Sequence, residues 1–124
     1  MLVEDDRMLA KSVMALLRDN KSVEIVHRSD ARTAIAKMRA DMDGRWFDLI
    51  LSDYSLGEGD KGDEVLRSAM TLQPKARRVL MSGEPAAEKW AKSGEAHVFY
   101  LKDSKLARSL LAEVEALSAE APVL

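Results

Sequence analysis

The sequence predicts an α/β fold of the doubly wound type, in which helices cover both faces of a parallel five-stranded sheet. Five short runs rich in Val, Ile and Leu recur along the chain, each typical of a strand buried on both faces. Stretches with apolar residues at helical spacing separate these runs. The chain has 124 residues, 47% of them hydrophobic and 32% charged, which favours one folded domain over residues 1–124 rather than disorder.

The predicted strands are, in chain order, Met1–Val3, Val23–Val26, Leu49–Leu51, Val79–Met81 and Val98–Leu101. Right-handed crossovers favour a three-layer, flavodoxin-like sandwich with strand order 2-1-3-4-5. That order places the first strand inside the sheet, where its short length forfeits hydrogen bonds. Either this strand is truncated or residues precede Met1, and the sequence leaves both alternatives open. The end of the chain, Ala119–Leu124, is expected to be a frayed tail.

Helices are predicted between the strands and after the last strand, from apolar stripes. These stripes are Leu9, Val13, Leu16 and Leu17; Ala31, Ala34, Ile35 and Met38; Val65, Leu66, Ala69 and Met70; and Leu106, Leu110, Val114 and Leu117. Ser29 or Asp30 is expected to cap the second helix and Ser104 the last one. The fourth helix, Ala86–Lys92, is the weakest, because Trp90 is its only large apolar residue.

Composition excludes several classes of protein. The chain lacks cysteine, which rules out disulfides, thiolate metal sites and a cysteine nucleophile. A formal net charge of −2 without a basic block argues against direct binding of nucleic acid. No apolar run is long enough to span a membrane, and the start of the chain lacks the pattern of a signal peptide. We therefore expect a cytoplasmic protein with no membrane partner.

Polar residues follow four of the predicted strands. Glu4 and Asp5 follow the first strand, Asp53 the third, Ser82 the fourth and Lys102 the fifth. Because ligands of open α/β sheets bind beyond the carboxyl ends of the strands, we expect these side chains to converge. Three carboxylates cannot all stay ionised there without help, and oxygen ligands suit Mg²⁺. The metal and the ammonium would balance the three negative charges, although an acidic triplet before a helix can also serve only as a cap.

Such a site suits phosphoryl transfer onto Asp53. A loose phosphoryl transition state spreads charge over its equatorial oxygens, which a metal, the Ser82 hydroxyl and the Lys102 ammonium could each contact. Carboxylates act as nucleophiles in aspartyl-phosphate chemistry. We therefore expect that Asp53 itself is phosphorylated.

Four segments together resemble a response-regulator receiver domain, at suitable spacing over essentially the whole chain. They are Leu2–Asp6, Asp48–Leu56 with the later Gly62, Leu80–Gly83 and Phe99–Lys102. The resemblance implies that Asp53 is the phosphoacceptor and that Mg²⁺ is the cofactor. It further implies metal ligation by Asp5 directly, by Glu4 through or beside water, by Asp53 and by the main-chain carbonyl of Ser55. We take Glu4 and Asp5, rather than Asp5 and Asp6, as the acidic pair.

The resemblance also implies a switch. Ser82 would donate a hydrogen bond to the phosphoryl group, Lys102 would pair with it, and the Phe99 rotamer would follow the hydroxyl. Three features depart from the family pattern: Asp103 stands where proline usually follows the lysine, Gly57 replaces a usual loop proline, and the segment between Ser82 and Lys102 is shorter. Because a non-proline cis bond costs roughly 2.5–4 kcal/mol, we expect a trans bond before Asp103.

The partners follow from the resemblance as expectations. A sensor histidine kinase or phosphotransfer protein would donate the phosphoryl group, and a downstream protein or output domain would read the switch. Receivers commonly form homodimers through the fourth helix, fifth strand and fifth helix. The chain would catalyse only its own phosphorylation and dephosphorylation.

Two alternatives come from other classes. One is a receiver-like binding module that works without phosphorylation, suggested by Asp103 and the weak fourth helix. The other is a flavodoxin-like or aspartyl-phosphate hydrolase enzyme. It is disfavoured because no Ser/Thr-rich phosphate loop follows the first strand and Ser55 stands where a second catalytic Asp would be.

Overall fold

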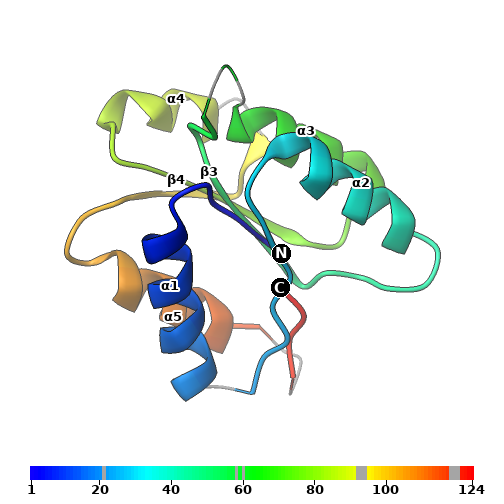
Figure 1. Cartoon of the computed structure of the whole chain (residues 1–124), viewed down its shortest axis with the longest axis horizontal. Helices are drawn as coiled ribbons and strands as arrows, with labels where there is room; N and C mark the ends of the chain where they lie inside the picture. The colour runs from blue at the N-terminus through cyan, green and yellow to red at the C-terminus, as the bar shows by residue number, and fades with distance from the viewer. Residues whose placement is uncertain (21, 58, 60, 92–94, 118–120) are drawn as a thin grey trace.

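The computed structural model describes residues 1–20, 22–57, 59, 61–91, 95–117 and 121–124, and it confirms the doubly wound α/β fold (Figure 1). Its parallel sheet has the predicted order β2-β1-β3-β4-β5. The strands are β1 (Leu2–Val3), β2 (His27–Arg28), β3 (Leu49–Asp53), β4 (Arg77–Ser82) and β5 (Val98–Leu101). Every residue of β3 is buried, as expected for a central strand covered on both faces.

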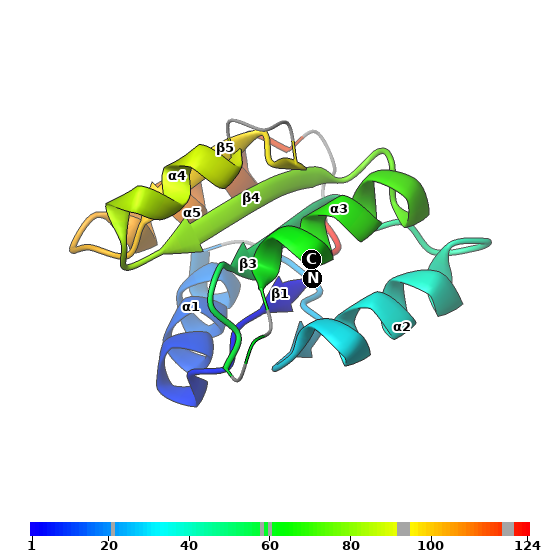
Figure 2. The same ribbon diagram turned by 90° about the horizontal axis from the view of Figure 1, so that it is seen from above.

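Helices cover both faces of the sheet (Figures 1 and 2). One face carries α1 (Arg7–Asn20) and α5 (Leu106–Glu115), and the other carries α2 (Ala31–Asp41) and α3 (Gly62–Leu72). Between β4 and β5, a 3₁₀ turn (Pro85–Ala87) leads into α4 (Glu88–Trp90), on the same side as α3. Among the described residues, no helix is long and apolar enough to cross a bilayer.

Two hydrophobic cores hold the layers together. Leu17 of α1 and Leu110 of α5 pack with Leu49 and Leu51 on one face of the sheet. Met38 of α2 and Leu66 of α3 pack with Ile50 on the other face. The alternation of β3 side chains between the two cores orients this strand and therefore sets where Asp53 emerges.

Helix boundaries agree with the sequence in part. Asp30 caps α2 as predicted, since its carboxylate accepts a hydrogen bond from the Thr33 N–H at 2.8 Å. Ser104 does not cap α5, which begins after Lys105; Asp103 instead accepts from the Lys105 N–H at 2.9 Å. This bond lies in the turn before the helix, so no side chain among the described residues caps α5.

Three details of the predicted helices differ from the structure: the burial of one residue, the end of the last helix and the length of the fourth helix. Met70 lies on α3 but is 44% exposed, because Leu72 rather than Met70 completes the buried stripe. Leu117 lies beyond α5, in a turn in which its N–H still donates to the Val114 carbonyl. The fourth helix is confirmed only over Glu88–Trp90, and Lys92 lies outside the described residues.

The second strand and the end of the chain also differ from the prediction. The paired residues of β2 are His27 and Arg28, not Val23–Val26, because the two-residue β1 reaches no further back along its neighbour. Of the predicted tail Ala119–Leu124, residues 119 and 120 lie outside the described residues, and the segment 121–124 is not frayed. Leu124 is fully buried, and its N–H donates to the Glu24 carbonyl at 2.7 Å. The described tail therefore pairs with the residues that were predicted to form the second strand.

Candidate functional site

Three carboxylates gather where β1 and β3 end. The register pairs Val3 with Ser52, so the next residues, Glu4 and Asp53, leave the sheet side by side. Glu4 is 1% exposed and Asp53 5% exposed, whereas Asp5 is exposed to solvent. One oxygen from each of the three carboxylates lies within 4.8 Å of the others. The convergence predicted from the strand ends is confirmed for these acids.

The third acid of the triplet has a different task. The Asp6 carboxylate accepts hydrogen bonds from the N–H groups of Met8 and Leu9, at 3.0 and 3.2 Å. These groups belong to the first turn of α1, so Asp6 acts as a helix cap. This assignment leaves Glu4 and Asp5 as the acidic pair, as the sequence suggested.

Lys102 reaches this cluster from the end of β5. Its Nζ lies 2.6 Å from Glu4 Oε1 and 2.9 Å from Asp53 Oδ2, so one ammonium bridges two buried carboxylates. The Lys102 N–H donates to the Ser82 carbonyl at 2.8 Å, which ties its backbone to the end of β4. The bond before Asp103 is trans, as predicted, since the described residues contain no cis peptide bond.

The three clustered carboxylates carry more formal negative charge than the Lys102 ammonium balances, and Glu4 is also buried. Burial, with the charge of Asp53, raises the pKa of Glu4 to about 7, although the Lys102 contact opposes that rise. Burial alone would lower the pKa of the Lys102 ammonium, but its contacts with Glu4 and Asp53 raise it instead. Three carboxylates facing one ammonium leave room for a divalent cation.

The loop after β3 closes over the cluster at a glycine. A Cβ on Gly62 would lie 1.9 Å from the Asp53 carbonyl oxygen, so only glycine fits there. The Gly62 N–H donates to the Tyr54 carbonyl at 2.6 Å and begins α3 beside the phosphoacceptor candidate. Gly57 has a φ of 89°, which favours glycine rather than proline, and its Cβ direction points to Asp5 Oδ2 at 4.0 Å.

The remaining predicted residues lie around the cluster. Ser82 is buried at the end of β4, and its Oγ accepts a hydrogen bond from the Glu84 N–H at 3.0 Å. Phe99 pairs with Leu80 in the sheet and packs half-buried against the core under α2 and α3. Ser55 is exposed and forms an isolated bridge with Lys61. The switch and ligand roles of Ser82, Phe99 and Ser55 stay predictions.

An aromatic pair beside Asp53 was not predicted. The ring of Tyr54 stacks on Trp90 of α4, with centroids 6.0 Å apart and planes at 16°. Lys61 lies over the Tyr54 ring at 5.4 Å and Lys89 over the Trp90 ring at 5.3 Å. The pairing depends on how α4 meets the end of β3, which spacing in the sequence does not show.

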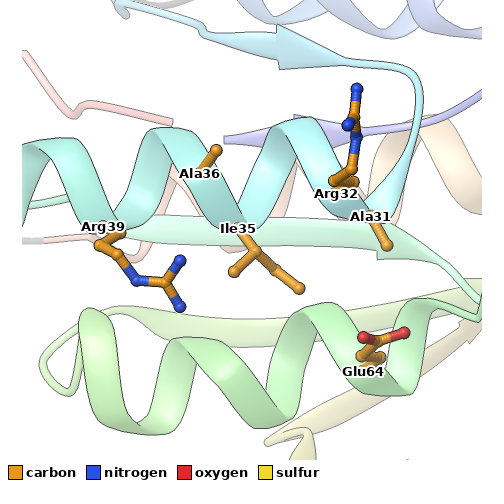
Figure 3. Close-up of a pocket in the computed structure, with 6 residues that line it drawn as sticks. All are labelled: Ala31, Arg32, Ile35, Ala36, Arg39 and Glu64. Atoms are coloured by element: carbon orange, nitrogen blue, oxygen red, sulfur yellow. The ribbon is translucent and has the colours of Figure 1, made fainter.

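A surface hollow of about 280 Å³ lies away from the acidic cluster, between α2 and α3 (Figure 3). Its lining is Ala31, Arg32, Ile35, Ala36, Arg39 and Glu64, with none of the clustered residues. The candidate site is therefore defined by converging charge rather than by this hollow.

Comparisons with solved structures agree with this fold. No protein-family model and no curated protein matches the sequence. Solved structures do match. A response regulator receiver protein from Sinorhizobium medicae is 24% identical, with a TM-score of 0.76, over 96% of this chain and 93% of that one. The N-terminal domain of a response regulator/sensory box/GGDEF 3-domain protein from Carboxydothermus hydrogenoformans is 25% identical, with a TM-score of 0.75, over 92% of this chain and 88% of that one.

A third structure is a response regulator from Burkholderia pseudomallei with a phosphorylated aspartic acid, calcium ion and citrate. It is 20% identical, with a TM-score of 0.74, over 93% of this chain and 69% of that one. These similarities extend over nearly the whole chain and include the strand order 2-1-3-4-5. The chain therefore has the fold of the CheY-like response-regulator receiver domains.

Proposed function

We propose that this chain is a phosphoacceptor receiver domain that is phosphorylated on Asp53 in the presence of Mg²⁺. The observation that carries the proposal is the contact of Lys102 Nζ with both Glu4 and Asp53, beside Asp5 at the same sheet edge. Further support comes from the structural neighbour from Burkholderia pseudomallei, which carries a phosphorylated aspartic acid.

The proposed reaction needs one nucleophile and a cation. A carboxylate oxygen of Asp53 attacks phosphorus, a new O–P bond forms, and the bond from phosphorus to the donor breaks. The donor, a phosphohistidine of a sensor kinase or phosphotransfer protein, keeps the bonding electron pair and takes up a proton. Lys102 can pair with the phosphoryl group on Asp53, because its ammonium already lies 2.9 Å from Asp53 Oδ2.

Mg²⁺ fits the residues that are present. Glu4, Asp5 and Asp53 supply only oxygen ligands, which this ion prefers, and their charge exceeds that of the single ammonium. The Ser55 carbonyl would add a main-chain ligand. When bound, the ion would neutralise the negative charge that develops on the transferred phosphoryl oxygens.

Phosphorylation would then act as a switch. The added charge would draw the Ser82 hydroxyl away from the Glu84 N–H, and Phe99 would follow it, biasing the surface formed by α4, β5 and α5. A downstream protein, an output domain or a second copy would bind this surface. We infer a cytoplasmic protein whose only catalysis is its own phosphorylation and dephosphorylation, without direct binding of nucleic acid.

The direct test is labelling by acetyl phosphate with Mg²⁺, measured by intact-protein mass spectrometry. We expect Asp53→Asn to abolish the added phosphoryl group. The matched control is Asp19→Asn, an exposed residue near the end of α1, which should be labelled like the wild type. Equal labelling of Asp53→Asn and wild type would contradict the assignment.

A second candidate is a receiver-like binding module that needs no phosphorylation. It is favoured by Asp103 in place of proline and by the stacking of Tyr54 on Trp90, which already holds α4 against the end of β3. Beryllofluoride, a phosphoryl mimic, distinguishes the two candidates. It should shift the amide spectrum of β5 and α4 in a phosphorylation switch and leave it unchanged in the binding module.

A further inference from the structure

The last residues of the described chain form a strand segment beside the approach to β2. The N–H groups of Glu24 and Val26 donate to the carbonyls of Pro122 and Leu124, at 3.0 and 2.6 Å. In return, the Leu124 N–H donates to the Glu24 carbonyl at 2.7 Å, and Val123 forms a parallel bridge with Glu24. Residues 122–124 thus lie parallel to their neighbour, as the sheet strands do.

The other side of this segment is paired as well. The Asp48 N–H donates to the Val123 carbonyl, and the Val123 N–H donates to Asp48 Oδ2, both at 2.8 Å. Asp48 directly precedes β3. The segment therefore joins the approaches to β2 and β3, the two strands between which β1 lies.

Residues 122–124 and β1 pair one after the other with the same stretch of chain, which leads into β2. Val26 donates its N–H to the Leu124 carbonyl and accepts at its own carbonyl from the Leu2 N–H at 2.8 Å. Figures 1 and 2 show the two chain ends side by side in both views. The order along this line is 122–124 followed by 1–3, so the two segments together fill the central position of the sheet.

Side-chain burial has the alternation of a strand inside the sheet. Val123 packs against the core under α2 and α3, whereas Leu124 packs fully buried in the core under α1 and α5. Successive side chains that point to opposite faces are the mark of a β-strand. The segment is therefore held by main-chain hydrogen bonds on both edges and by packing on both faces.

We propose that Pro122–Leu124 is a docking strand that positions the acidic cluster. β1 itself spans only Leu2 and Val3, with Met1 hydrogen-bonded to Leu49 and Leu51 just before it, and Glu4 follows directly. By joining the residues that precede β2 and β3, the docking strand maintains the distance between these two strands. It thereby fixes the register of β1, which lies between them. A slip of one residue would move Glu4 to the other face. This inference rests on the proposed Mg²⁺ site. It says that the affinity of that site for Mg²⁺ depends partly on residues 122–124, which lie far from Glu4 and Asp53 in the sequence.

The test uses the full chain with Leu124→Gly, which removes the buried anchor. We expect faster amide hydrogen exchange at Glu24, Val26 and Asp48, and Mg²⁺ binding about tenfold weaker by titration calorimetry. Amides of β4 should keep their protection, which shows that the fold persists. The control is Leu117→Gly, which also removes a side chain from the core under α1 and α5 but leaves the docking strand intact. Unchanged Mg²⁺ affinity despite lost protection would overturn the proposal.

A disulfide provides the rescue. Glu24→Cys and Val123→Cys place the only two cysteines of the chain at bridge partners. In the Leu124→Gly background, oxidation should restore both amide protection and Mg²⁺ affinity, and failure to restore the affinity would contradict positioning. If Leu124→Gly also exposes β4, Asp48→Ala replaces it, because that change removes the side-chain acceptor of the Val123 N–H and keeps the main-chain bond from the Asp48 N–H to the Val123 carbonyl. A wild type that protects these amides but binds no Mg²⁺ would refute the proposed metal site instead.

Discussion

The affinity of this chain for Mg²⁺ should fall about tenfold from about pH 8 to about pH 6. Burial and the charge of Asp53 raise the pKa of Glu4 to about 7, so this carboxyl is largely protonated at the lower pH. A cation that needs the ionised form must displace that proton. With a pKa of about 7, competition weakens binding by a factor of about 11 at pH 6 and about 1.1 at pH 8.

Titration calorimetry in buffers of different ionisation enthalpy measures both the affinity and the protons released. We expect about 0.9 proton per Mg²⁺ at pH 6 and about 0.1 at pH 8. Glu4→Gln, which cannot ionise, is the control and should bind with one affinity at both pH values. Equal wild-type affinity at the two pH values, or a tenfold change that persists in Glu4→Gln, would refute the assignment.

The same pKa shift predicts how stability depends on pH without a divalent cation. Since the pKa of Glu4 is about 7 in the folded chain and 4.5 ordinarily, the folded state binds more protons between these values. The free energy of unfolding should therefore fall by up to about 3 kcal/mol as pH rises through this window. Denaturant unfolding with and without Mg²⁺ checks this, because saturating cation should remove most of the loss.

Two further predictions concern the surrounding structure. Gly62→Ala should lower the free energy of urea unfolding by about 3 kcal/mol or more, because its Cβ would meet a main-chain oxygen at 1.9 Å; Gly44→Ala, with nothing within 4 Å, is the control and should change it little. Tyr100, whose hydroxyl donates to the buried Glu113 at 2.5 Å, should ionise with a pKa of about 12, measured as the difference in ultraviolet titration between wild type and Tyr100→Phe. Glu113→Gln should return that midpoint toward 10, the ordinary value, and an unchanged midpoint would contradict the role of burial beside a carboxylate.

The sequence was sufficient to predict the sheet order and the acidic cluster. Buried runs such as Leu49–Leu51 are apolar at every position because helices cover both faces, and this pattern is local. Once the strands are known, parallel topology brings their carboxyl ends together, so Glu4, Asp5, Asp53 and Lys102 could be grouped without coordinates. These candidate site residues are predictable because each lies at or just beyond the carboxyl end of a strand.

The remaining features depend on pairings between distant residues. Val23–Val26 has the apolar character of a strand, but only the structure shows that Glu24 and Val26 pair with the end of the chain rather than with β1. The tail Ala119–Leu124 is short and contains a proline, and its sequence does not show that Leu124 is buried in line with the two-residue β1. The stacking of Tyr54 on Trp90 likewise depends on where α4 meets β3.

The excess negative charge of the acidic cluster makes the stability of the fold depend on the protons or cations that bind there. Lys102 contacts Glu4 and Asp53 at once, yet burial and the charge of Asp53 still raise the pKa of Glu4 to about 7. Whatever supplies positive charge, a proton at low pH or a divalent cation at neutral pH, must therefore stabilise the fold. A phosphoryl group on Asp53 adds negative charge to the same place. Because linkage is reciprocal, bound cation and phosphorylated Asp53 should each favour the other, and the empty, unmodified cluster should be the least stable form near neutral pH.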